Sequence, residues 1–432
     1  MLLRRLGILA LCGLLPLAPL RAAVEIQLES QGVRRIPILI QAFEGEQVDT
    51  RQLSRIITDD LDRTGLFRAF HQPVPTLGPF EEPDYDAFDP SQQEYMLVGR
   101  VDADGQRVTY QLIDLVTQRP DEAFALAIGP GQERLVAHTI ANWLYEKLAG
   151  IPGVFTSKIA YVLRTGDKRS ATYELKVADY DGFGAQTLIK SPEPIISPEW
   201  MPDGNRILYV SYERKKPIVY EHQLLTGQRK VVASFKGNNS SPAMSPDRRW
   251  IAVALSESGS TQIHLLSADG TRKLRLRESA GIDTEPVFSP TDPNLLAFVS
   301  DSSGSPQIYL RDRASGAERR LTFGSGYNVS PRFSPDGGML TFIRRDANGF
   351  NVHIADSAAT DGATVPLTGI DLADSPSFSP NGEMLLFKND ARPNILYTVS
   401  INGKITRPFT IAEQGEIKDP AWSPASTLNN WY

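Results

Sequence analysis

The stretch Ser330-Pro331-Arg332-Phe333-Ser334-Pro335-Asp336-Gly337 decides the fold, because close copies of it recur along the chain. Five further copies of this Ser-Pro-x-aromatic-Ser-Pro-Asp-Gly pattern are present, and successive first prolines lie 44 or 45 residues apart. A fixed period of this length is the signature of a repeat architecture. The first prolines of the six copies are Pro198, Pro242, Pro286, Pro331, Pro376 and Pro420.

Each copy predicts four short β-strands. The first proline cannot donate a ladder hydrogen bond, so it suits the start of a strand. A large apolar residue two positions later can pack between sheets, and Pro-Asp-Gly or Pro-Asn-Gly makes a tight turn. A second strand such as Leu340-Thr341-Phe342-Ile343 follows, and two more strands come after further turns. Four antiparallel strands per repeat of this length are typical of a propeller blade.

The two ends of the repeat region complement each other. Residues 158–189 have the pattern of a second, third and fourth strand without a preceding Ser-Pro strand. The last copy, Asp419–Pro424, supplies only a first strand. Joining the two fragments in one sheet leaves no free edge at the seam. We therefore expect a six-bladed β-propeller over residues 151–432, closed by the C-terminal strand.

The preceding region, residues 23–150, lacks the period and predicts a small α/β domain. Apolar residues at helical spacing indicate two helices, over Thr50–Leu66 and Arg134–Leu148. Alternation over residues 95–116 predicts a hairpin. The proline-rich and acid-rich segment 71–91 is interpreted as a solvated loop.

The first 22 residues differ in character from the rest of the chain. Arg4 and Arg5 precede the apolar run Leu6–Leu20, and the small residue Ala22 follows it. This order is typical of a secretory signal peptide, and the run is shorter than the roughly 20 residues that span a bilayer. We expect a signal peptide over residues 1–22, and therefore an exported protein.

Composition narrows the classes of function. The only cysteine, Cys12, lies in the expected signal, so neither an internal disulfide nor a Cys/His zinc site is expected in the mature chain. The net charge of −6 becomes −9 once Arg4, Arg5 and Arg21 are removed. An acidic chain is unsuited to non-specific nucleic-acid binding. Apolar content of 41% argues against disorder and against a polytopic membrane protein, and no direct membrane insertion is expected.

The whole chain resembles the TolB family, the periplasmic component of the Tol-Pal system of Gram-negative bacteria. Besides the order of signal, α/β domain and repeats, the stretches Lys158-Ile159-Ala160-Tyr161-Val162 and Pro420-Ala421-Trp422-Ser423-Pro424 are similar to the family pattern. The resemblance implies a non-enzymatic periplasmic adaptor without a cofactor or metal. It also implies that the propeller binds the lipoprotein Pal and that TolA recognises the mature N-terminal segment. Its implied role is to maintain outer-membrane integrity and to support constriction during cell division. Other outer-membrane proteins are further candidate partners.

Loops that lead into the first strand of each blade converge at one mouth of a propeller. The resemblance aligns these loops with the Pal-facing mouth of the family, so their polar residues are candidate Pal contacts. The alternative is that these side chains only cap turns. The candidates are Asn238, Asn239, Ser241, Thr284, Glu285, Asn328, Ser330, Asp374, Lys418 and Asp419.

The mature N-terminus carries a second candidate site. Apolar and polar residues alternate there, as in a strand that can be added to the edge of a partner's sheet. The pattern alone favours an edge strand of the α/β domain, whereas the resemblance favours recognition by TolA. The candidate residues are Val24, Glu25, Ile26, Gln27, Leu28 and Glu29.

Hypotheses of an enzymatic function have less support in the sequence. A hydrolase of the α/β type would need Gly-x-Ser-x-Gly, which does not occur. A propeller enzyme with a cation held in the axial channel is the alternative function, with Asp283, Glu285, Asp374 and Asp419 as available acids. A sugar-binding propeller would need exposed aromatic residues at a mouth, where Tyr327 is the only candidate. No residue is assigned a catalytic role.

Overall fold

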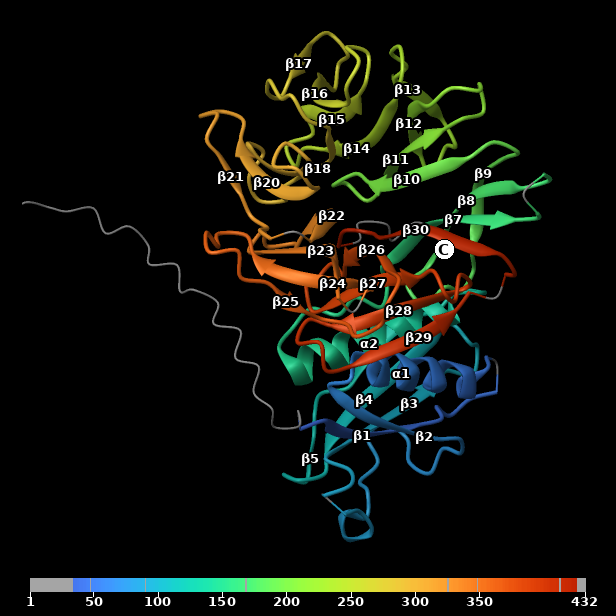
Figure 1. The fold of residues 1–432 in the computed structure, drawn as a ribbon. Helices are drawn as coiled ribbons and strands as arrows, with labels where there is room; N and C mark the ends of the chain where they lie inside the picture. The colour runs from blue at the N-terminus through green and yellow to red at the C-terminus, as the bar shows by residue number, and fades with distance from the viewer. Residues whose placement is uncertain are drawn as a thin grey trace, which may run out of the picture. The chain divides into compact units, whose positions relative to one another are not determined.

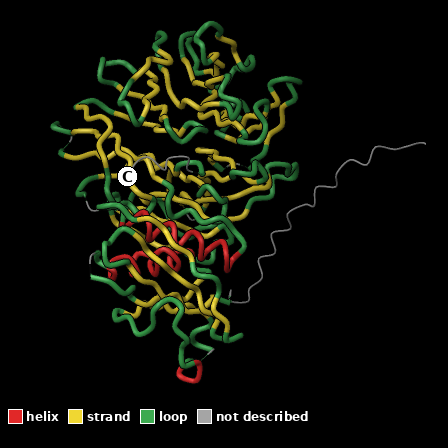
Figure 2. The backbone as a smooth tube through the Cα atoms, turned by 180° about the vertical axis from the view of Figure 1, so that it is seen from behind, coloured by secondary structure: helices red, strands yellow, loops and turns green. Residues whose placement is uncertain are grey.

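The structure is a computed structural model that describes residues 34–425, except positions 47, 90, 168, 325, 348 and 412. The expected signal peptide, residues 1–22, and the candidate TolA segment, residues 24–29, both lie outside the described residues. In the described range, no helix is long and apolar enough to cross a membrane. Apart from α1, α2 and a short 3-10 turn, the described chain consists of strands and loops (Figure 2).

The N-terminal region is a mixed β-sheet covered by two helices. Strand β1 pairs in parallel with both β2 and β3, while β3 and β4 form the expected antiparallel hairpin. The strand order is β2-β1-β3-β4-β5, with β6 paired to β4. The strands are β1 (Ile36–Gln41), β2 (Phe67–Gln72), β3 (Tyr95–Val101), β4 (Arg107–Asp114), β5 (Arg119–Pro120) and β6 (Phe124–Ala127).

Both expected helices are present, and local sequence fixes their ends. Helix α1 (Thr50–Thr64) begins where the Asp49 carboxylate accepts a hydrogen bond from the Gln52 amide at 2.9 Å. It ends at Gly65, whose φ of 73° is the left-handed conformation that glycine adopts easily. Helix α2 (Glu133–Ala149) ends in the same way at Gly150. The two helices lie side by side on one face of the sheet (Figure 1).

The segment expected to be a solvated loop has a structural role instead. It contains the 3-10 turn η1 (Tyr85–Ala87). Leu77, Tyr85 and Phe88 from this segment pack against buried residues on the sheet face away from the helices. These three apolar side chains, spaced among prolines and acids, cover that face, so the expectation of a wholly solvated loop was wrong.

The second region consists of six four-stranded sheets, as expected. Each sheet is one blade, and its first strand is innermost (Figure 1). Blades 1–3 contain β10 (Ile195–Trp200), β11 (Arg206–Ser211), β12 (Ile218–Gln223), β13 (Arg229–Ala233); β14 (Asn239–Met244), β15 (Trp250–Leu255), β16 (Gln262–Ser267), β17 (Lys273–Arg275); β18 (Asp283–Phe288), β19 (Leu295–Ser300), β20 (Gln307–Asp312) and β21 (Glu318–Arg320).

The remaining three blades include the seam. Blades 4–6 contain β22 (Tyr327–Phe333), β23 (Met339–Asp346), β24 (Gly349–Asp356), β25 (Val365–Pro366); β26 (Ala373–Phe378), β27 (Met384–Asn389), β28 (Ile395–Ser400), β29 (Thr406–Thr410); β30 (Glu416–Trp422), β7 (Lys158–Thr165), β8 (Thr172–Asp179) and β9 (Gln186–Ser191). Strand β30 pairs with β7, with Trp422 opposite Ile159. Closure of the propeller by the C-terminal strand is therefore confirmed.

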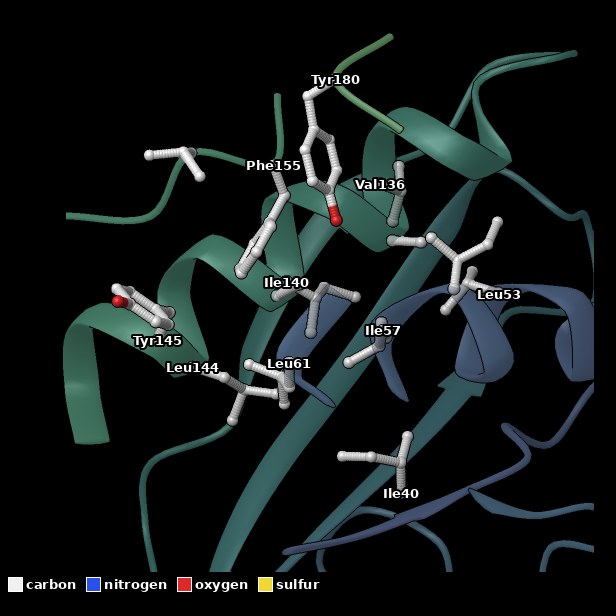
Figure 3. Packing of buried hydrophobic residues seen from close by; sticks show 14 of the residues in the cluster. Ile40, Leu53, Ile57, Leu61, Val136, Ile140, Leu144, Tyr145, Phe155 and Tyr180 are labelled. Carbon is white, nitrogen blue, oxygen red and sulfur yellow. The ribbon is translucent and has the colours of Figure 1, made fainter. Parts of the chain in front are cut away.

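A shared hydrophobic core joins the two helices to blade 6. Leu53, Ile57 and Leu61 of α1 meet Ile140 and Leu144 of α2 in the view of Figure 3. The same cluster continues to Phe155, Tyr180 and Trp422 at the base of blade 6. Because these side chains are almost fully removed from water, the core resembles a domain interior and stabilises the packing of both regions.

Buried charged groups cross the same boundary and are paired with one another. We call Asp60, Arg134, His138, Tyr180 and Asp181 the junction network. The Tyr180 hydroxyl donates to Asp60 at 2.6 Å, and His138 Nδ1 lies 2.7 Å from the other Asp60 oxygen. Arg134 lies 3.2 Å from His138 Nε2 and donates to Asp181 at 2.6 Å. Because arginine can only donate, the neutral His138 ring accepts at Nε2 and donates from Nδ1 to Asp60. Burial lowers the pKa of His138, but Asp60 and Asp181 raise it, and the net direction is upward, toward the charged ring.

Candidate functional site

Each innermost strand is interrupted by a β-bulge directly before its first proline. The strand register shifts at this point in all six blades. The residue before each proline adopts a left-handed φ of 48–55°, a conformation that costs a non-glycine residue about 1–3 kcal/mol. We call these six residues the bulge ring: Ser197, Ser241, Glu285, Ser330, Ser375 and Asp419.

The bulges turn backbone N–H groups toward acidic side chains of the channel. The amide of Ser197 donates to the Asp419 carboxylate of the neighbouring blade at 2.9 Å. Ser330 likewise donates to Glu285 of its neighbouring blade at 2.6 Å, and Ser375 donates to Asp374 at 2.8 Å. In these three blades the bulge thus exchanges ladder hydrogen bonds for contacts to carboxylates near the propeller axis.

The bulge ring surrounds a cavity of about 270 Å³, which we call the axial cavity. Four acidic residues line the cavity: Glu199, Glu285, Asp374 and Asp419. Arg332 is the one cation among its described lining residues. Lys388, opposite Asp374 in the adjacent strand, lies 3.0 Å from that carboxylate. Acids therefore outnumber the cations that face them.

The protonation of these acids reflects their enclosure. Burial raises the pKa of Glu199, although Arg332 acts in the opposite direction. Burial also raises the pKa of Glu285, against the effect of the Ser330 amide. The pKa of Asp419 is raised by burial and by Asp374, while the Ser197 amide lowers it. The axial cavity therefore holds carboxylates whose charge is incompletely compensated.

An ion pair lies across the channel below the bulge ring. Arg332 Nη2 of blade 4 is 3.6 Å from Glu199 Oε2 of blade 1. These two blades face each other across the axis of a six-bladed propeller, so the pair bridges the channel. Both residues line the axial cavity and also a second, more apolar cavity on the other side.

The structure brings most of the sequence-derived Pal candidates together at this mouth. Asn239 and Asn328 are fully buried and hydrogen-bond to their own loops or to a neighbouring strand, so they shape the loops. The remaining eight are partly exposed. Those that line the axial cavity are Ser241, Glu285, Ser330, Asp374 and Asp419; Asn238, Thr284 and Lys418 lie beside them on the same strands or entering loops.

Sequence reasoning missed three charged residues of the channel, Glu199, Arg332 and Lys388. A signal for the first two was present, because they follow the first proline in two repeats where Ala243, Val287 and the other copies have small or apolar residues. A charged residue at a repeat position that otherwise holds a small or apolar residue calls for a partner. Lys388 could not be assigned without the strand register.

A second cluster of possible metal ligands lies at the junction. One ligand atom each from His138, Asp179 and Asp181 lies within 4.8 Å of the others. The positive charge that a metal ion would bring to these acids is already supplied by two side chains. Arg134 contacts Asp181 and His138, and Lys158 contacts Asp179 at 2.6 Å. The cluster therefore fits a structural ion-pair network better than a metal site.

The fold and this site define a class: a six-bladed propeller with an N-terminal α/β domain, whose mouth presents a strained ring around a charged cavity. Two family models match the corresponding parts of the chain. One is described as the TolB beta propeller domain and matches residues 145–426, and the other is the TolB amino-terminal domain and matches residues 24–120.

Relatives and solved structures agree with these matches. The Tol-Pal system protein TolB of Bordetella pertussis is 40% identical over 298 residues, which cover 68% of this chain and 67% of the relative. The protein of the same name from Aromatoleum aromaticum is 43% identical over about half of each chain. The crystal structure of TolB from Acinetobacter baumannii covers 92% of this chain and 98% of its own, with 32% identity and a TM-score of 0.82. The chain therefore belongs to the TolB family of Tol-Pal system proteins.

Proposed function

We propose that the protein is a non-enzymatic periplasmic adaptor of the Tol-Pal system. In this proposal the propeller mouth binds Pal and the segment Val24–Glu29 binds TolA, in support of outer-membrane integrity and constriction during division. The observation that carries the Pal site is the convergence of the partly exposed candidate residues on one charged axial cavity. Family membership supports the pathway.

The surroundings of the axial cavity fit a protein partner. Ile282 and Leu372, on the loops that enter blades 3 and 5, are exposed to 49% and 39%, and Tyr327, the first residue of β22, is exposed to 41%. Apolar side chains of this size beside hydrogen-bonding groups are typical of protein interfaces. A partner that places hydrogen-bond donors or a positive charge in the axial cavity would meet its surplus of carboxylates.

The alternative, a propeller enzyme with a cation in the channel, rests on the same carboxylate surplus. Glu285, Asp374 and Asp419 are the residues that could hold a cation there. All three already accept backbone hydrogen bonds, from Ser330, Ser375 and Ser197 respectively, which leaves fewer oxygen atoms for a hard cation that takes about six to eight. The adaptor is therefore the better-supported function.

Titration calorimetry with the soluble domain of Pal tests the mouth. The double variant Thr284→Ala/Glu285→Gln should bind Pal at least about tenfold more weakly, equivalent to about 1.4 kcal/mol. The matched control is Thr360→Ala/Asp361→Asn, an exposed threonine–acid pair in the turn between β24 and β25, away from the mouth. Equal affinity of both variants and the wild type would refute the Pal site.

Deletion of residues 24–29 tests the other half of the proposal. The shortened mature protein should lose binding to TolA and keep its affinity for Pal, because the mouth residues are unchanged. Titration of both partners with the same preparation separates loss of folding from loss of the TolA site. Retained binding to TolA would contradict the assignment of this segment.

A further inference from the structure

A loop of the N-terminal region exposes one aromatic side chain. Phe80 lies between β2 and β3, in the segment whose Leu77, Tyr85 and Phe88 cover one face of the sheet. Its side chain is 75% exposed, more than that of any other large apolar residue in the described part of the chain. Buried aromatic rings contribute strongly to the stability of a fold, and Phe80 contributes little of this kind. We call residues 76–86 the Phe80 loop.

The backbone of Phe80 is strained as well. Its φ of 70° lies in the left-handed region, which a bulky residue rarely adopts and which glycine adopts without a steric cost. The chain therefore keeps, at this position, a side chain that is neither packed nor suited to the backbone. A residue that is unfavourable for the fold in both respects is a candidate for a role in binding.

Two buried glutamines of the sheet hold the Phe80 loop in place. The side-chain oxygen of Gln41, at the end of β1, accepts hydrogen bonds from the Thr76 and Leu77 amides at 2.8 and 3.2 Å. The side-chain oxygen of Gln111, in β4, accepts from the Phe80 amide at 2.8 Å. Because the loop is fixed before any partner arrives, Phe80 would lose little conformational freedom on binding.

The charge around Phe80 is negative. Four exposed acids follow it within six positions: Glu81, Glu82, Asp84 and Asp86. The sequence has no lysine or arginine between Arg68 and Arg100. Among the described residues, Arg100 is the one cation paired with an acid of the loop, and it is shared between Glu81 at 3.4 Å and Glu44 at 2.5 Å. The surface around the exposed ring is therefore complementary to a cationic surface and repels an anionic one.

We propose that the Phe80 loop binds a protein partner that offers an apolar pocket surrounded by lysine or arginine side chains. Phe80 enters the pocket, and the acids that follow it contact the cations of the rim. A central, fully desolvated aromatic residue within a polar rim is the usual arrangement of an interface hot spot. The negative charge of the loop disfavours both an anionic lipid surface and a second copy of this acidic chain. This surface is separate from the propeller mouth and from residues 24–29, so it does not rest on the proposed function.

Photocrosslinking followed by titration tests the proposal. The mature chain carries p-benzoylphenylalanine in place of Phe80, or in place of Leu225 as the control, and is irradiated in the periplasm of the source cells. Leu225 is 55% exposed in the turn between β12 and β13. We expect one protein to be cross-linked from position 80 and not from position 225. That protein is then purified and titrated into the mature chain.

The titration decides whether the cross-linked protein recognises the loop as proposed. Phe80→Gly should weaken its binding at least about tenfold, whereas Leu225→Gly should leave it unchanged. The melting temperature of Phe80→Gly should equal or exceed that of the wild type, because glycine relieves the strained φ and keeps the amide that donates to Gln111. Glu81→Gln/Glu82→Gln should weaken binding at least about threefold at about 0.1 M salt, and by less at about 1 M salt, because salt screens exposed charges.

Four results would overturn the proposal. One is the absence of any protein cross-linked from position 80 beyond those found from position 225. Another is cross-linking to a second copy of the chain, which would make the loop a contact between copies. A third is Phe80-dependent binding to vesicles of phosphatidylethanolamine and phosphatidylglycerol, which would make it a membrane contact. The last is an affinity for the purified protein that either Phe80→Gly or Glu81→Gln/Glu82→Gln leaves unchanged, because the ring or the acids would then play no part in recognition.

Discussion

The junction network and the axial cavity both enclose charged groups, but they treat them in opposite ways. At the junction, Asp60 accepts from Tyr180 and contacts His138, and Arg134 donates to Asp181. In the axial cavity the carboxylates of Glu285 and Asp419 meet mainly backbone N–H groups, and their pKa values are raised. Paired buried charges are costly to separate, whereas charges left short of partners reduce stability and are available to a ligand.

The largest expected effect is at the centre of the paired network. Asp60→Ala leaves the buried Tyr180 hydroxyl and His138 ring without their acceptor. Removal of one member of a buried network costs roughly 3–5 kcal/mol, which urea unfolding should detect. Asp59→Ala, at an exposed position of the same helix, is the control and should cost less than about 1 kcal/mol. Equal losses would contradict a structural role for the network.

A smaller effect is expected at Asp181, where the paired charge creates a pH dependence. Burial raises the pKa of Asp181. The charges of His138 and Arg134 lower it by more, so the net direction is downward. A carboxylate with a lowered pKa stabilises the fold above its unfolded pKa of about 3.9, and this contribution is lost as pH falls through the folded pKa. Asp181→Asn should therefore cost about 1–2 kcal/mol at pH 7 and progressively less at acid pH.

The opposite sign is expected in the axial cavity. The pKa values of Glu285 and Asp419 are raised, so the folded state binds protons more tightly than the unfolded state. Stability therefore falls as pH rises from the unfolded pKa values of these two acids to their folded values. The variant Glu285→Gln/Asp419→Asn keeps oxygen acceptors for Ser330 and Ser197. It should be more stable than the wild type by about 1 kcal/mol at pH 7, with no difference near pH 3. A loss of stability at pH 7 would show that these acids are already compensated.

The repeat made the propeller predictable from sequence. Six copies of one pattern determine six blades, and complementary fragments at the two ends determine the closure by β30. The α/β helices were predictable because apolar residues recur at helical spacing in both segments. The loop that covers the far side of the sheet was not, because Leu77, Tyr85 and Phe88 have no periodicity and acquire their packing only from the tertiary fold.

The location of the candidate residues in the fold was easier to predict from the sequence than which of their side chains are exposed. Loop positions relative to the first prolines identified the mouth, but the sequence does not show that Asn239 and Asn328 are buried within it. The left-handed bulge ring was also not foreseen, because serine or acid before proline is ordinary in extended chain. The Glu199–Arg332 pair joins residues 133 positions apart on facing blades, and such a contact follows only from the closed propeller.

The central claim is that the undercompensated acids of the mouth are retained for partner binding at a cost in stability. Titration calorimetry of the soluble Pal domain with Glu285→Gln/Asp419→Asn tests it most directly. We expect this variant, although more stable at pH 7, to bind Pal at least about tenfold more weakly than the wild type. Affinity equal to or higher than that of the wild type would contradict the claim, because neither carboxylate charge would then contribute to recognition.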